Sequence, residues 1–323
     1  MRHIVLFADG GISIGTGHIF RLFPIFRCLR TMGVSAEMWV PLEQRLLAKL
    51  GLEGVQSASI DPKNVVATLS RSAPAVVILD TYRHRQQLYK LLDKGGHRLV
   101  IFDDHFCVDR KVELIVNSSP MVSADNYVTG LASKFLLGPT YTSVSGCFVE
   151  ARSRYVVSKE ISSIVVALGG SDTCGSLRTL LSTMLPLLQS PVEICVLSAI
   201  PISMDTPEHV KLTCIWLDQD SLAQRMPDFD LAILAGGTML WQTACVGLPT
   251  ISWPQTPGQK KHAATWESKG AIFVITELDA LSAALTQLRS QHLRLQMSNV
   301  GRNLVDGLGA RRVAACLHSM LEG

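Results

Sequence analysis

A glycine-rich segment near the start of the chain, residues 14–21 with the sequence IGTGHIFR, combines groups that could do chemistry. It follows the apolar run 4–7 and precedes a helical pattern, and its glycines let the backbone approach a ligand closely. The N–H groups and the positive dipole end of the following helix point at the same place. His18 lies on the first helical turn, and Arg21 shares its face one turn later. The segment predicts a phosphorylated substrate and a proton-transfer step, although His18 alone could simply hydrogen-bond a loop.

Two further glycine loops follow apolar runs in the second half of the chain. They are residues 169–172, with the sequence GGSD, and residues 236–238, with the sequence GGT. Glycine pairs free backbone N–H groups for an anion, and Thr238 adds a hydroxyl. Each loop alone is explained equally well as a tight strand-to-helix turn. Two such loops in one half, with a third in the other half, favour a bound diphosphate.

Titratable residues also follow apolar runs in the first half. Asp80 and Tyr82 come after 76–79, and residues 103–105, with the sequence DDH, come after 100–102. The carboxyl ends of parallel strands are where an open sheet presents groups to a ligand. The alternative for each is a polar cap on the next helix. Adjacent residues on an extended chain point in opposite directions, so 103–105 are not expected to form a metal site.

No known cofactor motif accompanies these loops. No G-K-[ST] follows a glycine loop, which disfavours ATP chemistry, and no G-x-G-x-x-G dinucleotide fingerprint is present. We therefore expect neither a cofactor nor a metal.

Short apolar, β-branched runs alternate with helical patterns along the whole chain. The runs lie at 4–7, 36–40, 75–79, 99–102, 114–116, 163–168, 192–197, 212–216, 231–235, 250–253 and 272–275. Helical patterns in the second half lie at 176–188, 238–247, 259–269 and 278–290. Continuous apolar strands that alternate with helices are typical of parallel sheets covered on both faces.

The second half restarts the pattern of the first, with a polar stretch at about 151–162 between them. We expect an α/β chain of two doubly wound domains, 1–155 and 156–323, which face each other across a cleft and bind ligand at the carboxyl ends of their strands. The last helix, at about 305–321, is expected to pack back on the first domain.

Composition limits the classes of function. The chain has 323 residues, of which 47% are hydrophobic and 18% charged, with a net charge of +3. This balance argues against a nucleic-acid partner, and no apolar run reaches the roughly 18 residues that a transmembrane helix needs. The eight cysteines are scattered, so we expect a reducing cytoplasm rather than a zinc site or a disulfide framework. The oligomeric state is left open.

Taken together and in order, these motifs resemble those of the UDP-2,4-diacetamido-2,4,6-trideoxy-β-L-altropyranose hydrolases of pseudaminic acid biosynthesis. The chain is also similar, more distantly, to the N-acetylglucosaminyltransferase that completes lipid II. The matching positions are 15–21 (G-x-G-H-x-x-R), 80–82 (D-x-Y), 102–104 with 116–117, 169–172 (G-G-[ST]-D), 235–238 with Trp241, 247–249, and Gln259 before a helix that ends at Gly270. The resemblance implies the GT-B fold.

The resemblance also implies a reaction, in which water attacks the anomeric carbon of a UDP-linked sugar and UDP leaves with inversion. The pathway would be nonulosonic acid biosynthesis, which serves surface polysaccharide or flagellin glycosylation. His18 would orient or deprotonate the water, while Tyr82 and Asp80 would position the sugar or the water. The backbone near Leu217 would meet the uracil. The expected substrate contacts are Gly17, Arg21, Asp104, Asn117, Gly169, Gly170, Ser171, Asp172, Leu217, Gly236, Gly237, Thr238, Gln242 and Gln259.

The chain departs from the family pattern at three places. Gln242 stands where many relatives carry a glutamate for the ribose hydroxyls, and Gly258 replaces a common asparagine. Residues 141–148 lack the arginine and the acidic residue that relatives carry there. Two other functions therefore stay open: a GT-B glycosyltransferase with a hydroxyl acceptor, and a nucleotide-sugar binding protein with weak activity.

Overall fold

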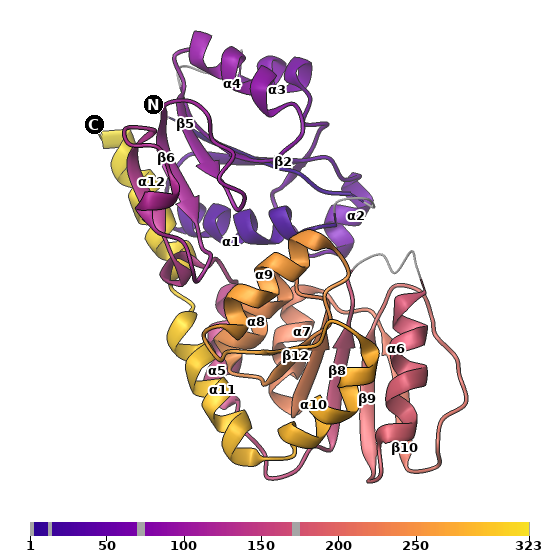
Figure 1. Ribbon diagram of the computed structural model, residues 1–323. Helices are drawn as coiled ribbons and strands as arrows, with labels where there is room; N and C mark the ends of the chain where they lie inside the picture. The colour runs from indigo at the N-terminus through magenta and orange to yellow at the C-terminus, as the bar shows by residue number, and fades with distance from the viewer. Residues whose placement is uncertain (1–2, 12–14, 70–74, 170–174, 323) are drawn as a thin grey trace. The chain divides into compact units, whose positions relative to one another are not determined.

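The computed structural model (Figure 1) describes residues 3–11, 15–69, 75–169 and 175–322. Their contacts divide the chain into two compact units, 1–145 with 307–323 and 146–306. The first unit holds β1 (Ile4–Ala8), α1 (Gly17–Thr31), β2 (Ala36–Val40), α2 (Gln44–Lys49), β3 (Gln56–Ser57), α3 (Pro62–Leu69), β4 (Val76–Asp80), α4 (Arg85–Lys94), β5 (Arg98–Phe102), β6 (Val112–Asn117), β7 (Ala132–Leu137) and α12 (Gly309–Glu322).

The strands of the first unit form one parallel sheet in the order β3-β2-β1-β4-β5-β6-β7. Alternate residues of β1 face opposite sides. Ile4 and Leu6 pack with α1 and α12, whereas Val5 and Phe7 pack with α3 and α4. Figure 1 shows the same division, with α1 and α12 on one side of the sheet and α3 and α4 on the other. Because helices cover both faces, the central strands are apolar throughout.

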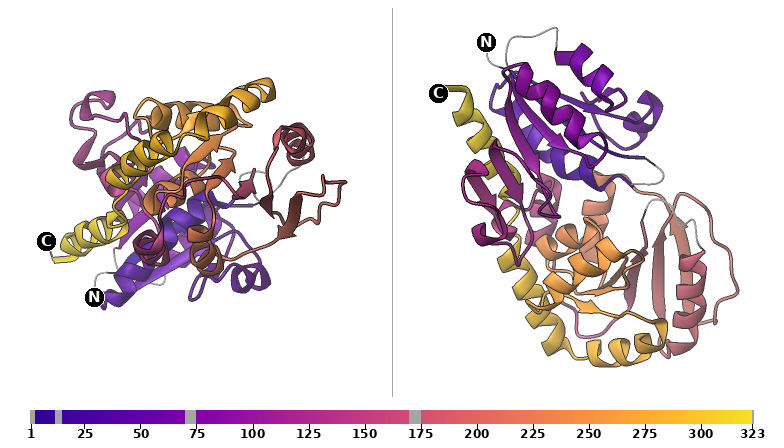
Figure 2. Two further views of the ribbon diagram at one scale, coloured as in Figure 1. Left: turned by 90° about the horizontal axis from the view of Figure 1, so that it is seen from below. Right: turned by 45° about the horizontal axis from the view of Figure 1, so that its top comes forward.

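The second unit repeats this plan. Its elements are α5 (Gly146–Arg154), β8 (Ser163–Ala167), α6 (Ser176–Met184), β9 (Val192–Leu197), β10 (Val210–Ile215), α7 (Gln219–Arg225), β11 (Leu231–Leu234), α8 (Met239–Val246), β12 (Thr250–Ser252), α9 (Pro257–Glu267), β13 (Phe273–Val274), α10 (Leu281–Leu288) and α11 (Gln291–Leu304). The parallel strand order is β10-β9-β8-β11-β12-β13. Leu177 and Leu181 of α6 pack on Ile164 of β8, and Figure 2 shows α6 running alongside the strands.

Each apolar run predicted as a strand coincides with an observed strand, within a few residues at its ends. Two edge strands of the first sheet, β3 and β7, were not predicted. Both residues of β3 are exposed, and the first half of β7 carries Ser133 and Lys134 toward solvent, so neither shows a continuous apolar run. Edge strands are solvated on one side, and their patterns are correspondingly weak.

The units divide the chain before α5, which packs on α7 and α8 of the second unit. The polar stretch at about 151–162 therefore begins inside a helix, whose residues Phe148 and Ala151 are buried. At the other end, α12 packs on α1 of the first unit. By their contacts, the units are thus bounded at 145/146 and 306/307.

Within the described ranges, no helix combines the length and the apolar character needed to cross a membrane.

Candidate functional site

The predicted histidine, tyrosine and acidic residues meet at the carboxyl edge of the first sheet. β1 and β4 are neighbours at its centre, and Ala8 pairs in register with Asp80. The strand order reverses direction between these two strands, which is where open α/β sheets bind ligands. The start of α1, which follows β1, and the loops after β4 and β5 therefore come together, and they carry His18, Tyr82 and Asp104.

Asp80 is the buried centre of this group, with no exposed surface. Arg21, on α1, donates to both of its carboxylate oxygens, from Nε and, at 2.5 Å, from Nη2. The second partner residue of Asp80 is His18, whose Nδ1 lies 2.7 Å from Oδ1. Burial by itself would raise the pKa of Asp80, but Arg21 and His18 outweigh it and keep this pKa at about 2. Asp80 is therefore a carboxylate at neutral pH.

The charge on Asp80 fixes the protonation of His18. A carboxylate only accepts hydrogen bonds, so Nδ1 of His18 must be the donor and carry the ring proton. Arg21 Nη2, at 3.3 Å from the same Nδ1, cannot accept it. In the neutral ring, Nε2 is then the unprotonated nitrogen, available to take a proton from another group.

Arg21 is buried with both acidic residues. Its side chain is 5% exposed, and Nη1 donates to Oδ2 of Asp104 at 2.6 Å. Burial alone would lower the pKa of Arg21, but Asp104 and Asp80 raise this pKa well above its ordinary value. The guanidinium of Arg21 thus pairs with two carboxylates, and the expected substrate contact from Arg21 stays a prediction.

Tyr82 lies over the same group. Its hydroxyl accepts from the backbone N–H of Asp104 at 3.1 Å and lies 3.4 Å from Oδ2 of that residue. Its ring meets His18 edge-on, with centroids 5.7 Å apart. Burial and the charge of Asp104 raise the pKa of Tyr82. The phenol is therefore protonated and acts as a hydrogen-bonding group beside the imidazole.

Asp80 does not occupy the place expected for a residue that positions sugar or water. Its carboxylate is enclosed by His18 and Arg21, so it acts on the surroundings through those two side chains. His18, by contrast, keeps 16% of its side-chain surface exposed, and Asp104 keeps 37%. The solvent-facing groups of the cluster are therefore His18, Tyr82 and Asp104.

Asp103 and Asn117 are adjacent to this cluster but do not join it. Asp103 is buried and accepts from the backbone N–H of Cys107 at 3.0 Å. Asn117 is 1% exposed and donates to the carbonyl of Asp103 at 2.6 Å and to the hydroxyl of Tyr127 at 3.0 Å. Because both amide protons are engaged, a substrate contact from Asn117 stays a prediction. Nowhere in the described residues do three His, Cys, Asp or Glu side chains gather in a metal-binding arrangement.

The sequence reasoning missed two supporting residues. Asp9, 1% exposed, accepts from the Thr81 hydroxyl at 2.9 Å and from Arg83 Nε at 2.8 Å, which ties the loop after β1 to the loop after β4. The guanidinium of Arg85 lies 4.6 Å from the centre of the Tyr82 ring. An acidic residue directly after the first apolar run was a usable signal for Asp9, whereas no sequence pattern indicated Arg85.

The start of α1 supplies backbone N–H groups in addition to these side chains. Gly17 is the first helical residue, Thr16 makes no side-chain capping bond, and the first turn carries no acidic residue. Within the described residues, neither the Thr16 side chain nor an acidic residue of the first turn therefore caps the N–H groups at the positive end of this helix. A substrate contact from Gly17 stays a prediction.

In the second unit, Gly169 and the glycine loop at 236–238 lie at the carboxyl edge of the sheet. Gly169 follows β8 and the loop at 236–238 follows β11, and these two strands are neighbours at the point where the strand order reverses. Gly169 and Gly236 have φ values of +111° and +94°, which favour glycine. Thr238 directly precedes α8 and makes no side-chain capping bond there. Gly170, Ser171 and Asp172 lie outside the described residues.

The remaining predicted residues line the same edge. Leu217, half-buried, lies between β10 and α7, and Gln242, 9% exposed, is on α8. Gln259 is on the first turn of α9, which begins after the cap Thr256, and its Oε1 accepts from the backbone N–H of Gln255 at 2.8 Å. Ligand contacts for each of these residues stay predictions.

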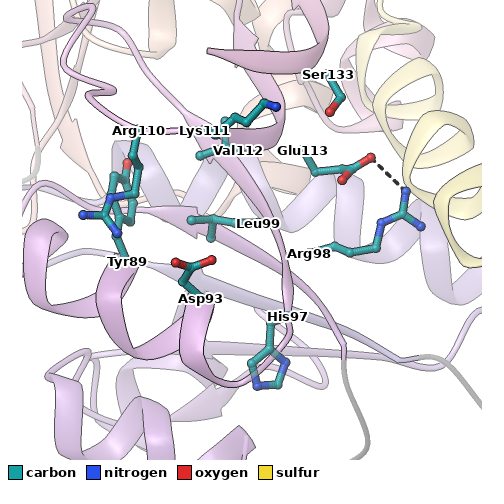
Figure 3. Close-up of a pocket in the computed structure, with 10 residues that line it drawn as sticks. All are labelled: Tyr89, Asp93, His97, Arg98, Leu99, Arg110, Lys111, Val112, Glu113 and Ser133. Atoms are coloured by element: carbon teal, nitrogen blue, oxygen red, sulfur yellow. Dashed lines mark hydrogen bonds and ion pairs between the residues drawn. The ribbon is translucent and has the colours of Figure 1, made fainter. Parts of the chain in front are cut away.

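A hollow of about 400 Å³ lies elsewhere on the first unit (Figure 3). It is lined by residues that include Arg98, Arg110, Lys111 and Glu113, and Arg98 pairs with Glu113 at 2.9 Å. These residues lie at the amino ends of β5 and β6, the opposite edge of the sheet from His18. Open parallel sheets bind ligands at the carboxyl edge, so this hollow is not the candidate site.

Comparison with known proteins gives relatives for the whole chain. No family model matches it. The spore coat polysaccharide biosynthesis protein SpsG of Bacillus subtilis is 25% identical over 340 residues, covering 99% of each chain. Among solved structures, MurG of Acinetobacter baumannii has a TM-score of 0.70 at 15% identity, covering 99% of this chain and 100% of that one. The glycosyltransferase SsfS6 of Streptomyces sp. SF2575, complexed with thymidine diphosphate, has a TM-score of 0.67 at 13% identity, covering 100% of both chains.

The chain has the GT-B fold. The two parallel sheets, each with a reversal of strand order at its centre, agree with the solved neighbours over nearly the full length. The prediction of two doubly wound, Rossmann-like halves is confirmed. At these identities the likeness to solved structures concerns the fold alone.

Proposed function

We propose that this protein hydrolyses a UDP-linked sugar at the anomeric carbon and releases UDP. The observation that carries the proposal is the pairing of His18 with the buried carboxylate of Asp80 at 2.7 Å. This pairing leaves Nε2 of His18 as a base, and a base that can take a proton from water is what hydrolysis of a sugar nucleotide needs most.

In this proposal, the second unit binds the nucleotide. The glycine loops after β8 and β11 supply N–H donors for the diphosphate, with Thr238 beside them. These donors also stabilise the charge that develops on UDP as it leaves, so little acid assistance is needed. The thymidine diphosphate in SsfS6 supports nucleotide binding on this fold.

The first unit would supply the chemistry. Nε2 of His18 takes a proton from water, Asp80 stabilises the resulting imidazolium, and the oxygen attacks the anomeric carbon opposite UDP, which predicts inversion. Tyr82 and Asp104 would orient the water or a sugar hydroxyl. Arg21 acts as a positioning residue, because it holds both carboxylates.

The sugar we propose is a diacetamido-trideoxy hexose, and the pathway is nonulosonic acid biosynthesis. The motif resemblance supports the sugar, and the name of SpsG, a spore coat polysaccharide biosynthesis protein, supports a role in the synthesis of a surface sugar. We propose no cofactor and no metal for this reaction.

A glycosyltransferase is the second candidate. SsfS6 bears that name and shares the fold. The departures of residues 141–148 from the hydrolase pattern keep this alternative open. A weakly active nucleotide-sugar binding protein is the third candidate. Incubation with UDP, CMP and GDP sugars without any acceptor, followed by NMR of nucleotide release, separates them. A hydrolase releases the nucleotide completely, a transferase releases it only slowly, and a binding protein releases none.

The decisive variant is His18→Ala. We expect it to fold normally and to abolish UDP release, because the water then has no base and removal of a general base costs roughly 10²–10⁴-fold in rate. UDP release is measured by NMR and folding by circular dichroism. His105→Ala is the matched control, since His105 is an exposed histidine near Tyr82. Near-normal turnover in His18→Ala would refute the mechanism.

A further inference from the structure

His262 is a histidine to which the proposed mechanism gives no role, although it contacts the glycine loop after β11. It lies on α9, one turn after Gln259. Its Nδ1 lies 2.8 Å from the carbonyl oxygen of Gly236. Its Nε2 lies 3.2 Å from Nε1 of Trp241 on α8 and 3.0 Å from Nε1 of Trp266 on α9. One imidazole therefore joins the loop to two helices.

These contacts admit a single protonation state of His262. An indole nitrogen only donates, so Nε2 must be unprotonated and accept from both tryptophans. A carbonyl oxygen only accepts, so Nδ1 must carry the proton and donate to Gly236. The ring is thus neutral, with its proton on Nδ1. A proton on Nε2 would face two N–H donors and break both contacts.

The carbonyl of Gly236 determines where the next N–H group points. The C=O of Gly236 and the N–H of Gly237 belong to one planar trans peptide, in which they point in opposite directions. Holding the carbonyl toward His262 therefore turns the N–H of Gly237 away from it. Gly237 is exposed, and within the described residues its N–H has no hydrogen-bond partner.

The surroundings of Gly236 leave its peptide little room for another orientation. A Cβ on Gly236 would lie 3.1 Å from the Ser252 hydroxyl oxygen and 3.3 Å from the backbone oxygen of Gln259. The peptide thus packs directly against β12 and the first turn of α9. His262 comes from the same helix as Gln259, so α9 contacts the loop through both its backbone and the imidazole.

We propose that His262 is a positioning residue for the nucleotide site. Its neutral ring holds the Gly236 carbonyl and so aims the Gly237 N–H at the diphosphate of a nucleoside diphosphate. This inference rests on the proposed function, because it assumes that the loop binds the diphosphate.

Two substitutions separate the two sides of the imidazole. The amide nitrogen of asparagine takes the place of Nδ1, so His262→Asn keeps a donor for Gly236 and loses the acceptor for the tryptophans. The amide oxygen of glutamine takes the place of Nε2, so His262→Gln keeps that acceptor and loses the donor. By calorimetry with UDP, we expect His262→Gln to bind about tenfold more weakly than the wild type, the effect of one lost hydrogen bond. His262→Asn should recover most of the affinity.

The matched control is His292→Gln. His292 is an exposed histidine of α11 in the same unit, so this variant should bind UDP as the wild type does. Equal affinities for the Asn and Gln variants, or weaker binding by the Asn variant alone, would overturn the proposal. Thermal unfolding checks that both variants remain folded.

Nitrogen-15 NMR of the unliganded wild-type protein tests the tautomer without any substitution. We expect a neutral His262 ring with its proton on Nδ1, and a proton on Nε2 at neutral pH would overturn the proposal. If the tautomer is found but the wild type does not bind UDP, the proposed function fails while the hydrogen-bonding scheme stands. The two failures are therefore distinguishable.

Discussion

The position of one proton determines what His18 can do. Asp80 accepts from Nδ1, and this leaves Nε2 as the basic nitrogen. Asp80 can perform this role only while it is ionised, and the buried Arg21 keeps it so. Three side chains thus act as one group, in which the exposed member depends on two that are hidden from solvent.

The variant Asp80→Asn tests this dependence. The amide can donate to Nδ1 and thereby favour the proton on Nε2, which removes the base. We expect the rate of UDP release to fall on the order of 10³–10⁴-fold, as for a catalytic histidine in the wrong tautomer. Steady-state kinetics would measure the fall, and a loss confined to KM would contradict the positioning role.

The ionisation of Asp80 also makes the free energy of unfolding depend on pH. The pKa of Asp80 is about 2 in the folded chain, below the value of about 3.9 for an unfolded aspartate. Its ionisation therefore stabilises the fold fully above about pH 4, by roughly 2–3 kcal/mol, and this stabilisation is lost as the pH falls toward 2. Urea unfolding should show a gap between the wild type and Asp80→Asn that narrows with falling pH. A difference in unfolding free energy that grows as the pH falls would contradict the expected direction.

At the scale of elements, the turn from β11 into α8 places adjacent glycines in different surroundings. Gly236 has φ +94°, and a β-carbon added there would meet neighbours at 3.1 and 3.3 Å, whereas one added at Gly237 would meet nothing within 4 Å. A side chain at Gly236 would meet both backbone strain and crowding. Only the first glycine is therefore required by the packing.

We expect Gly236→Ala to lower the free energy of unfolding by roughly 1–3 kcal/mol. Gly237→Ala should change it by less than about 1 kcal/mol, because its site is open. Denaturant unfolding of the two variants provides the comparison. Equal losses would show that the crowding at Gly236 does not matter.

At the scale of the whole molecule, the chain ends in the unit where it began. α12 packs on α1, and Val313, Ala314 and Leu317 are fully buried there. Arg312 also donates to the carbonyl of Thr140 at 2.9 Å. The helix that carries His18 is therefore supported by residues almost at the other end of the sequence.

We expect Leu317→Ala to destabilise the first unit by about 2–5 kcal/mol, the cost of a cavity at a fully buried leucine. Hydrogen exchange should then quicken in α1 and stay unchanged in α8 of the second unit. Leu308→Ala is the matched control, because Leu308 is 41% exposed and its truncation should cost less than about 0.5 kcal/mol. Slowly exchanging α1 amides in Leu317→Ala would contradict the packing.

The sequence alone determined the local elements of this protein. Apolar runs predicted the buried strands because parallel strands covered on both faces must be apolar throughout. Glycines directly after such a run predicted the turn at 236–238, and the helical pattern placed His18 on a first turn. The solvated edge strands β3 and β7 escaped detection. So did α7, α11 and α5, whose second half lies in a polar stretch.

Only the tertiary structure decided which of these groups meet. Asp80 follows His18 by 62 residues and His262 follows Gly236 by 26, and no local pattern encodes contacts at such separations. They arise because parallel strands bring their carboxyl ends to one edge, where Arg21 and His18 keep Asp80 ionised against the effect of burial and hydrogen bonding selects the tautomer of each histidine. The sequence thus supplied the groups and their strands, while the packing assigned the protons.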